Sequence, residues 1–134
     1  MLDRISHVGL AVKDLEAAIQ FYERVFGLRV AHRWVARADR MEAALLKSGD
    51  MEIELMQPLE DDSPVGRFIA RRGEGIHHVA YRVDDVAGAL QRVRDAGVET
   101  IDQEPRVGGG GRTRVGFLHP RGTFGVLTEL EQEC

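Results

Sequence analysis

The sequence predicts an α+β fold made of two βαβββ modules that arose by internal duplication. The first observation is a repeat, because residues 7–30 (HVGLAVKDLEAAIQFYERVFGLRV) resemble residues 78–100 (HVAYRVDDVAGALQRVRDAGVET). In both copies, a run rich in β-branched residues precedes a segment with helical periodicity, and further strand-like runs follow. The identical pairs sit at positions with structural meaning: His7 and His78, Val8 and Val79, Val12 and Val83, Asp14 and Asp85, Ala18 and Ala89, Gln20 and Gln91.

The first module is expected over about residues 5–58. Its first strand covers 5–12, and Asp14 then follows as a helix N-cap whose carboxylate accepts a backbone N–H. Apolar residues recur at helical spacing up to Gly27, which is suited to end the helix in the left-handed conformation. Three more strands are expected at 28–35, 41–47 and 51–57, with the turn SGD at 48–50 between the last two.

The second module, about 76–131, repeats this order. A strand at 76–83 leads to the N-cap Asp85 and a helix that ends at Gly97, and strands are expected near 98–102, 113–118 and 124–131. A linker at 59–75 joins the modules and holds a short helix, with Ser63 as N-cap and Pro64 in its first turn. We expect one domain over 1–134, in which the two halves form a curved mixed sheet.

Composition excludes several classes of function. The chain has 134 residues, 43% of them hydrophobic and 30% charged, as in a soluble globular domain. A net charge of −4 without a basic stripe argues against a nucleic-acid partner. No apolar run approaches the roughly 18 residues of a membrane span, and the N-terminus lacks the apolar core of a signal peptide. The single cysteine, Cys134, fits a cytoplasmic protein.

The repeat also brings out four candidate metal ligands. Each half has a histidine at the head of its first strand, His7 or His78, and a glutamate in its last strand, Glu54 or Glu129. Strand alternation turns these side chains away from the apolar residues that pack on the helices. Two imidazoles and two carboxylates suit a divalent ion such as Zn, Co, Ni or Mn, with positions left for water or substrate. His77 has the opposite parity, and its counterpart is Ser6, so it is not expected to be a ligand.

These residue types also have simpler interpretations. A single histidine in a strand is more often structural than a ligand, and an exposed glutamate is usually solvated. Four matched residues on duplicated positions favour a metal site, because two carboxylates in one concavity are costly without a cation.

With these duplicated modules and four matched residues, the chain resembles the vicinal oxygen chelate superfamily, whose paired βαβββ modules cup a divalent metal. Within it, the chain is similar to the methylmalonyl-CoA epimerase family over essentially its whole length. The segment HVGLAVKDLEAAIQFYERVFGL is general to the superfamily. IELMQPLEDDSPVGRFIARRGEGIHHVAYRVDD and GFLHPRGTFGVLTEL are more particular to the epimerases. The family's ligand positions fall on His7, Glu54, His78 and Glu129, and the family often has Gln at the second of them.

The resemblance implies a metal-dependent epimerase that interconverts (2R)- and (2S)-methylmalonyl-CoA, with cobalt as the expected metal and a homodimer as the expected assembly. A proton leaves C2 and returns to the other face through a metal-stabilised enolate, which calls for two acid/base groups. Glu129 is one candidate. Glu42 is the other by analogy with some epimerases, but its facing is ambiguous and a solvated strand-edge glutamate is equally open.

Two other functions remain open. Glyoxalase I uses a His/Glu/His/Glu set, so it is the first alternative, although the two particular segments favour the epimerase. The second is a non-catalytic small-molecule binder of the bleomycin-resistance type, which has no need of a complete ligand set. The glycine run at 108–111 offers backbone N–H groups to a carboxylate or phosphate, and Arg112 and Arg114 offer charge to the phosphates of CoA, but a flexible loop and solvated side chains are the favoured interpretation. For His119 we favour a turn.

Overall fold

A computed structural model of the chain describes residues 1–134, and its elements follow the duplicated order. Contacts between backbone segments divide the chain into two compact units, His7–His77 and a second unit made of Met1–Ser6 with His78–Cys134. Apart from two 3₁₀ turns, the elements are β1 (Arg4–Ala11), α1 (Leu15–Phe26), β2 (Arg29–Ala36), β3 (Met41–Ser48), β4 (Met51–Pro58), α2 (Pro64–Arg72), β5 (Gly75–Arg82), α3 (Val86–Asp95), β6 (Arg106–Gly108), β7 (Thr113–Leu118) and β8 (Thr128–Glu133). The two βαβββ modules of the predicted fold are therefore present.

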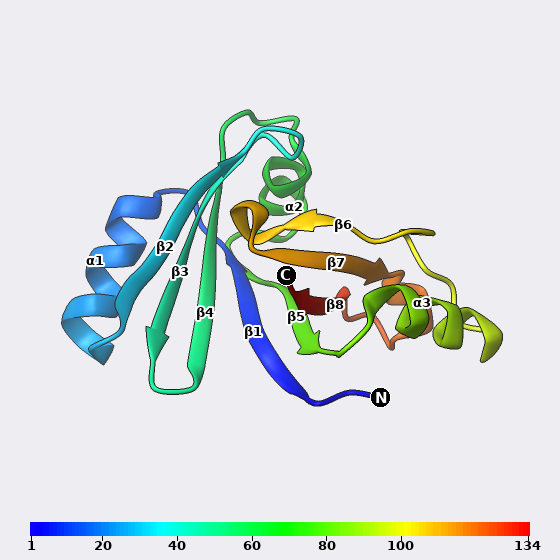
Figure 1. Cartoon of the computed structure of the whole chain (residues 1–134). Coiled ribbons are helices and arrows are strands. Elements are labelled where there is room, and N and C mark those ends of the chain that lie inside the picture. The colour runs from blue at the N-terminus through cyan, green and yellow to red at the C-terminus, as the bar shows by residue number, and fades with distance from the viewer. The chain divides into compact units, whose positions relative to one another are not determined.

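In the unit His7–His77 the strands lie in the order β2-β3-β4-β1. β1 runs parallel to β4, while β3 is antiparallel to both of its neighbours, so the sheet is mixed. Figure 1 shows α1 lying along one face of these strands. The core on that face contains Leu15, Ile19, Leu28, Ala44, Leu46 and Leu55. Each fully buried leucine contributes about 1.5–3 kcal/mol relative to an exposed one, so this face fixes the strand register.

The opposite face of the same strands is covered in part by α2. Val65 of this helix packs on three strand residues, Ala11, Ala43 and Met56, and larger side chains close the cluster: Trp34, Met41, Phe68 and Ile69. Odd- and even-numbered residues of β3 thus face different helices. This division determines which side chains of β3 share a face with Glu54.

The predicted helix ends are confirmed. The carboxylates of Asp14 and Asp85 accept the backbone N–H groups of Ala17 and Gly88, at 3.1 and 3.2 Å. Ser63 caps α2 in the same way, through the N–H of Gly66 at 3.1 Å. Gly27 ends α1 with φ 71°, a left-handed conformation that a residue with a Cβ adopts only at a cost.

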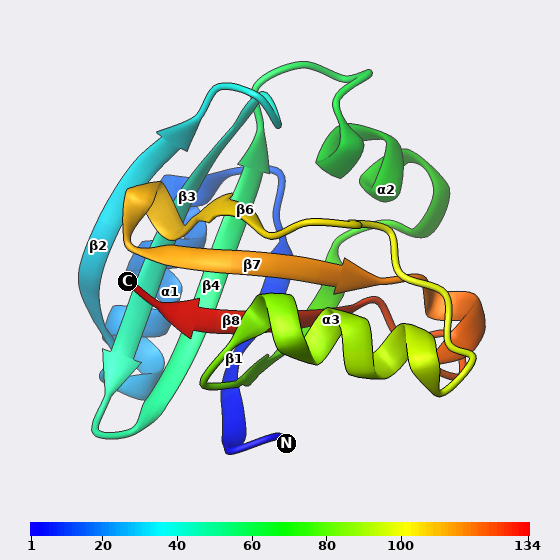
Figure 2. The same ribbon diagram turned by 45° about the vertical axis from the view of Figure 1, so that its right-hand side comes forward.

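In the second unit the strand order is β5-β8-β7-β6, with β5 parallel to β8 and the remaining pairs antiparallel. Figure 2 shows α3 lying across β7 and β8. The helix needs a close approach to β7, because a Cβ on Gly116 would meet Leu90 Cδ1 at 2.7 Å. The core here contains Val83, Val86, Ala89, Leu90, Val93, Leu118 and Leu130.

Two strand predictions in this unit need correction. Residues 98–102 form no strand, only an isolated bridge from Thr100 to Leu118, and the outer strand is β6 further along. The last strand begins at Thr128 rather than at 124, because residues 120–122 form a 3₁₀ turn and Phe124 and Gly125 follow with positive φ. No helix of the structure has the length and apolar character needed to cross a membrane.

Candidate metal centre

The first unit brings together His7 of β1 and Glu54 of β4. The parallel register pairs Gly9 with Glu54, so both ligand candidates project from the face that carries Ala11 and Met56. His7 Nε2 lies 3.9 Å from Glu54 Oε2. Both residues are buried, with 4% and 8% of their surface exposed. The predicted facing of this pair, away from α1, agrees with the structure.

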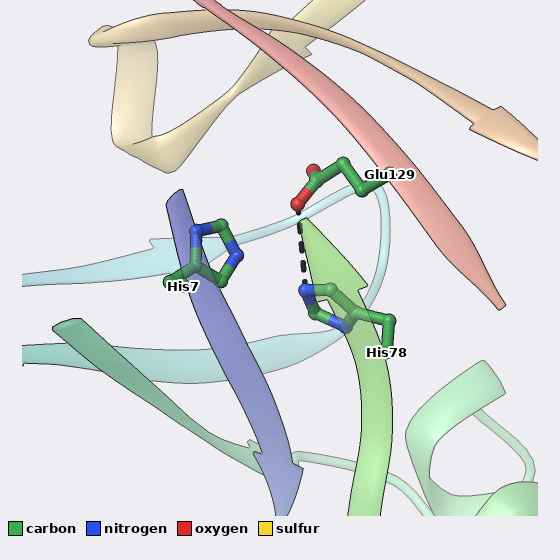
Figure 3. Close-up of side chains that lie close together, drawn as sticks. All are labelled: His7, His78 and Glu129. Carbon is green, nitrogen blue, oxygen red and sulfur yellow. Dashed lines mark ion pairs between the residues drawn. The ribbon is translucent and has the colours of Figure 1, made fainter. Parts of the chain in front are cut away.

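The second unit brings together His78 of β5 and Glu129 of β8 in the same way. Ala80 pairs with Glu129 across the parallel strands, and the two side chains point toward each other in Figure 3. The distance between His78 Nε2 and Glu129 Oε1 is 3.4 Å, and the residues are 3% and 7% exposed. The ring of Phe117 meets His78 edge-on, with 5.8 Å between centroids. This contact fixes the plane of the imidazole.

The donor atoms in both pairs fit a metal ion. Imidazole nitrogen and carboxylate oxygen bind divalent ions at about 2.0–2.2 Å, which puts two neighbouring donors about 3–3.5 Å apart. The distance in the second pair falls in this range, and that in the first is slightly longer. Each pair also has a buried carboxylate, which a cation would stabilise. The chemistry of both pairs therefore suits a divalent ion.

His77 lies next to His78 but has a different environment. Its ring packs on Phe68 of α2, with 4.9 Å between centroids and 66° between planes, and Arg72 stacks on the same phenyl ring at 5.8 Å. The first unit thus uses His77 to hold α2 against the start of β5. Sequence parity separated the two histidines, but it did not identify this packing role.

The structure does not bring Glu42 to Glu54. Glu42 pairs in register with Gln57, whereas Glu54 pairs with Leu45, so the two glutamates lie on opposite faces of the sheet. Arg33 donates a hydrogen bond to Glu42 at 3.0 Å and also pairs with Glu16 of α1 at 2.6 Å. Glu42 therefore belongs to the α1 side. The role expected for it, a second acid/base, stays a prediction.

Sequence reasoning missed a polar network in the second unit. Ser6 donates a hydrogen bond to the buried carboxylate of Glu131, and Arg82 donates to the same carboxylate at 3.0 Å. Arg82 also pairs with Glu133 at 2.8 Å. Burial acts to lower the pKa of the Arg82 guanidinium, but its hydrogen bonds to Glu133 and Glu131 outweigh burial and raise that pKa above the ordinary value. The signal was available, because Arg82 and Glu131 share the parity of His78 and Glu129.

The remaining candidates lie in turns or on the surface. Gly109, Gly110 and Gly111 form a 3₁₀ turn with positive φ throughout, and Arg112 and Arg114 beside it are exposed. His119 caps a second 3₁₀ turn, where its Nδ1 accepts the N–H of Arg121 at 3.1 Å. The turn predicted for His119 is confirmed.

Comparison with known proteins identifies the family to which the chain belongs. A family model described as the glyoxalase/bleomycin resistance protein/dioxygenase superfamily matches residues 6–117. The ethylmalonyl-CoA/methylmalonyl-CoA epimerase of Cereibacter sphaeroides is 36% identical, over 98% of this chain and 99% of its own. The human mitochondrial methylmalonyl-CoA epimerase is 33% identical, over 98% of this chain and 74% of its own.

A solved structure gives the same result for the fold. A methylmalonyl-CoA epimerase in complex with methylmalonyl-CoA and NH4+ superposes with a TM-score of 0.95 at 38% identity, over 100% of this chain and 96% of that one. Family model, relatives and structure agree over essentially the whole chain. The chain belongs to the glyoxalase/bleomycin resistance protein/dioxygenase superfamily and, within it, to the methylmalonyl-CoA epimerase family of isomerases.

Proposed function

We propose that this protein interconverts the (2R) and (2S) epimers of methylmalonyl-CoA. The observation that carries the proposal is the full-length similarity to methylmalonyl-CoA epimerases, at 33–38% identity, in a chain that presents a buried His–Glu pair in each of its two halves. The same pairs would serve glyoxalase I. Relatives that match over nearly the whole of both chains favour the epimerase.

We propose further that His7, Glu54, His78 and Glu129 bind one divalent metal ion. Two neutral imidazoles and two carboxylates carry a charge of about −2 in total, which one divalent cation neutralises. The duplicated origin of the four residues supports their use as one set. When bound, the ion would supply Lewis-acid stabilisation of the negative charge that develops on the substrate's oxygen atoms. The expected metal is cobalt, and zinc, manganese and nickel are the alternatives.

Glu129 is the residue that we propose to carry a proton on one face of C2. In the first half-reaction the C2–H bond breaks and the proton moves to a carboxylate oxygen of Glu129. The electron pair is delocalised over the thioester carbonyl and the free carboxylate of the substrate. This carboxylate is only 7% exposed, so it holds the proton in a largely water-excluded environment.

The test uses the whole protein, stripped with a chelator and reloaded separately with Co, Zn, Mn or Ni. Each form is incubated in D2O with (2R)-methylmalonyl-CoA, and epimerisation and deuteration at C2 are followed together. We expect both in the cobalt form and neither in the stripped protein. Turnover of the methylglyoxal–glutathione hemithioacetal without any exchange at C2 would instead identify glyoxalase I.

We also propose that the protein is a cytoplasmic homodimer, as its resemblance implies. The free cysteine, Cys134, is exposed and needs no oxidising compartment. An exposed apolar group on α1, made of Phe21, Val25 and Phe26, provides a surface that a second copy would cover. Light scattering on the metal-loaded protein measures the mass, for which we expect twice the 14.9 kDa of the chain.

A further inference from the structure

Phe117 of β7 lies beside both ligand candidates of the second unit. Its backbone pairs in register with Glu129 across the antiparallel strands β7 and β8, so its side chain and that carboxylate project from the same face. A Cβ on the preceding Gly116 would meet Leu90 of α3, so Phe117 itself faces away from this helix. The phenyl ring also meets the imidazole of His78 edge-on, with 79° between the planes. One aromatic side chain thus adjoins both members of the His–Glu pair.

The first unit has no aromatic ring at the equivalent place. There Leu45 of β3 pairs in register with Glu54, as Phe117 pairs with Glu129. The His–Glu distance beside the leucine is 3.9 Å, against 3.4 Å beside the phenylalanine. Two donors on one ion lie about 3–3.5 Å apart. The aromatic ring therefore accompanies the pair that has the spacing of two metal ligands.

The backbone of Phe117 is held by the segment that precedes β6. Its N–H donates a hydrogen bond to a carboxylate oxygen of Asp102 at 2.8 Å, and its carbonyl oxygen accepts the N–H of Ile101 at 2.8 Å. The next residue, Leu118, bridges to Thr100. This segment forms no strand, but it anchors the position from which the phenyl ring projects.

The carboxylate of Asp102 also places a cation over the ring. Arg106 of β6 follows four residues later in the chain, and its Nε lies 3.1 Å from Asp102 Oδ1. The guanidinium carbon of Arg106 lies 5.1 Å from the centroid of the Phe117 ring, within the range of a cation–π contact. Asp102 therefore holds both the backbone of Phe117 and the side chain that covers its ring.

We propose that Arg106 is a positioning residue for the metal centre and acts through the ring of Phe117. This deepens the proposed function and rests on the metal site proposed there. The guanidinium holds the phenyl ring, and the ring restricts the rotation of the His78 imidazole beside Glu129. Partners that orient a metal ligand commonly contribute about ten- to hundredfold in metal affinity. Arg106 thereby strengthens the binding of a divalent ion although it carries a positive charge itself.

The sign of the expected effect separates positioning from simple electrostatics. A cation near a metal site repels the ion, so removal of the Arg106 charge should by itself lower the Kd for cobalt. Loss of positioning should raise this Kd instead. For R106M we expect an increase of about two- to fivefold, which corresponds to an exposed cation–π contact. R106K keeps a cation over the ring and should bind cobalt as the wild type does. Calorimetric titration of the stripped proteins with cobalt measures each Kd.

The ring itself is tested by F117L, which copies the leucine of the first unit. It should raise the Kd for cobalt by about ten- to hundredfold and shift the visible absorption bands of the cobalt form, which report the coordination geometry. Because Arg106 acts through the ring, R106M should add nothing further in the F117L background. An equal effect of R106M with and without the ring would overturn the proposal. A Kd in R106M that equals the wild-type value or falls below it would do the same.

R114M is the matched control. Arg114 lies on the same strand with the opposite parity to Phe117 and is exposed, so its replacement should leave the Kd for cobalt unchanged. The side chain of Arg106 is 45% exposed, so R106M should change the free energy of unfolding of the stripped protein little. A marked loss of stability in R106M with an unchanged Kd and spectrum would show a merely structural role and overturn the proposal. Wild-type protein that binds none of the four metals would refute the proposed metal site itself, whereas an unaffected R106M refutes only the role of Arg106.

Discussion

The two halves of the chain present the same pair of candidate metal ligands in different surroundings. Each has a buried histidine at the head of its first strand and a buried glutamate in its last, at 3.9 Å in the first half and 3.4 Å in the second. The parallel pairings that hold them are equivalent, with Gly9 opposite Glu54 and Ala80 opposite Glu129. The donors have therefore stayed similar while the rest of each module diverged.

The divergence begins two residues beyond each glutamate. In β4 that position is Met56, which packs beneath α2, whereas in β8 it is Glu131, which binds Arg82 and Ser6. The outer strands differ as well, since β2 has eight residues and a bulge while β6 has three. The halves therefore share their candidate metal ligands but differ in the side chains around them.

The largest expected effect comes from breaking the ligand symmetry. H78A should abolish binding of a divalent ion, because it removes one of two nitrogen donors from a set that has no spare one. H77A should leave metal content nearly intact and should cost about 1 kcal/mol of stability, through the lost contact with Phe68. Calorimetric titration with cobalt and elemental analysis measure both variants.

The equivalent change in the first half, H7A, provides the comparison. We expect it to reduce metal binding as strongly as H78A does. Retention of metal by H7A together with loss in H78A would mean that the second half alone holds the ion, and the four-ligand proposal would then be wrong. Loss of metal in H77A would contradict the strand register of β5.

A smaller effect is expected from the polar network found only in the second half. R82M leaves the buried carboxylate of Glu131 without its arginine, and removal of one partner from a buried pair costs about 3 kcal/mol. Urea unfolding of the stripped protein measures the loss without a contribution from metal binding. E133Q is the matched control, because this partner of Arg82 is exposed and its removal should cost about 0–1 kcal/mol. A loss in R82M as small as the loss in E133Q, about 0–1 kcal/mol, would show that the network contributes little to stability.

These differences also show how far the sequence could predict the site. The duplication located the four ligand candidates, and strand alternation predicted their facing, because both depend only on local pattern. The facing of Glu42 depended on register within β3, which its neighbours left ambiguous. The facing of His32 could not be predicted, because the bulge at Ala31 reverses the alternation, and a bulge depends on pairing with another strand rather than on local composition. The prediction of a strand at 98–102 was wrong for the same reason, because the segment that pairs with β7 lies further along the chain, at β6.

The smallest effect concerns the turn that precedes the last strand of each half. Gly49 occupies the left-handed position before β4, with φ 60°, whereas Phe124 occupies such a position before β8, with φ 58°. A left-handed conformation costs a residue with a Cβ about 1–2 kcal/mol, and the phenyl ring is fully exposed, so it recovers nothing by burial. F124G should therefore raise the free energy of unfolding by about 0.5–1 kcal/mol, after the extra backbone entropy of glycine is subtracted. F124A separates the two causes, because it removes the ring but keeps the strain, and it should leave stability unchanged. If F124A raised the free energy of unfolding as much as F124G, the destabilisation would come from the exposed ring and not from the left-handed backbone.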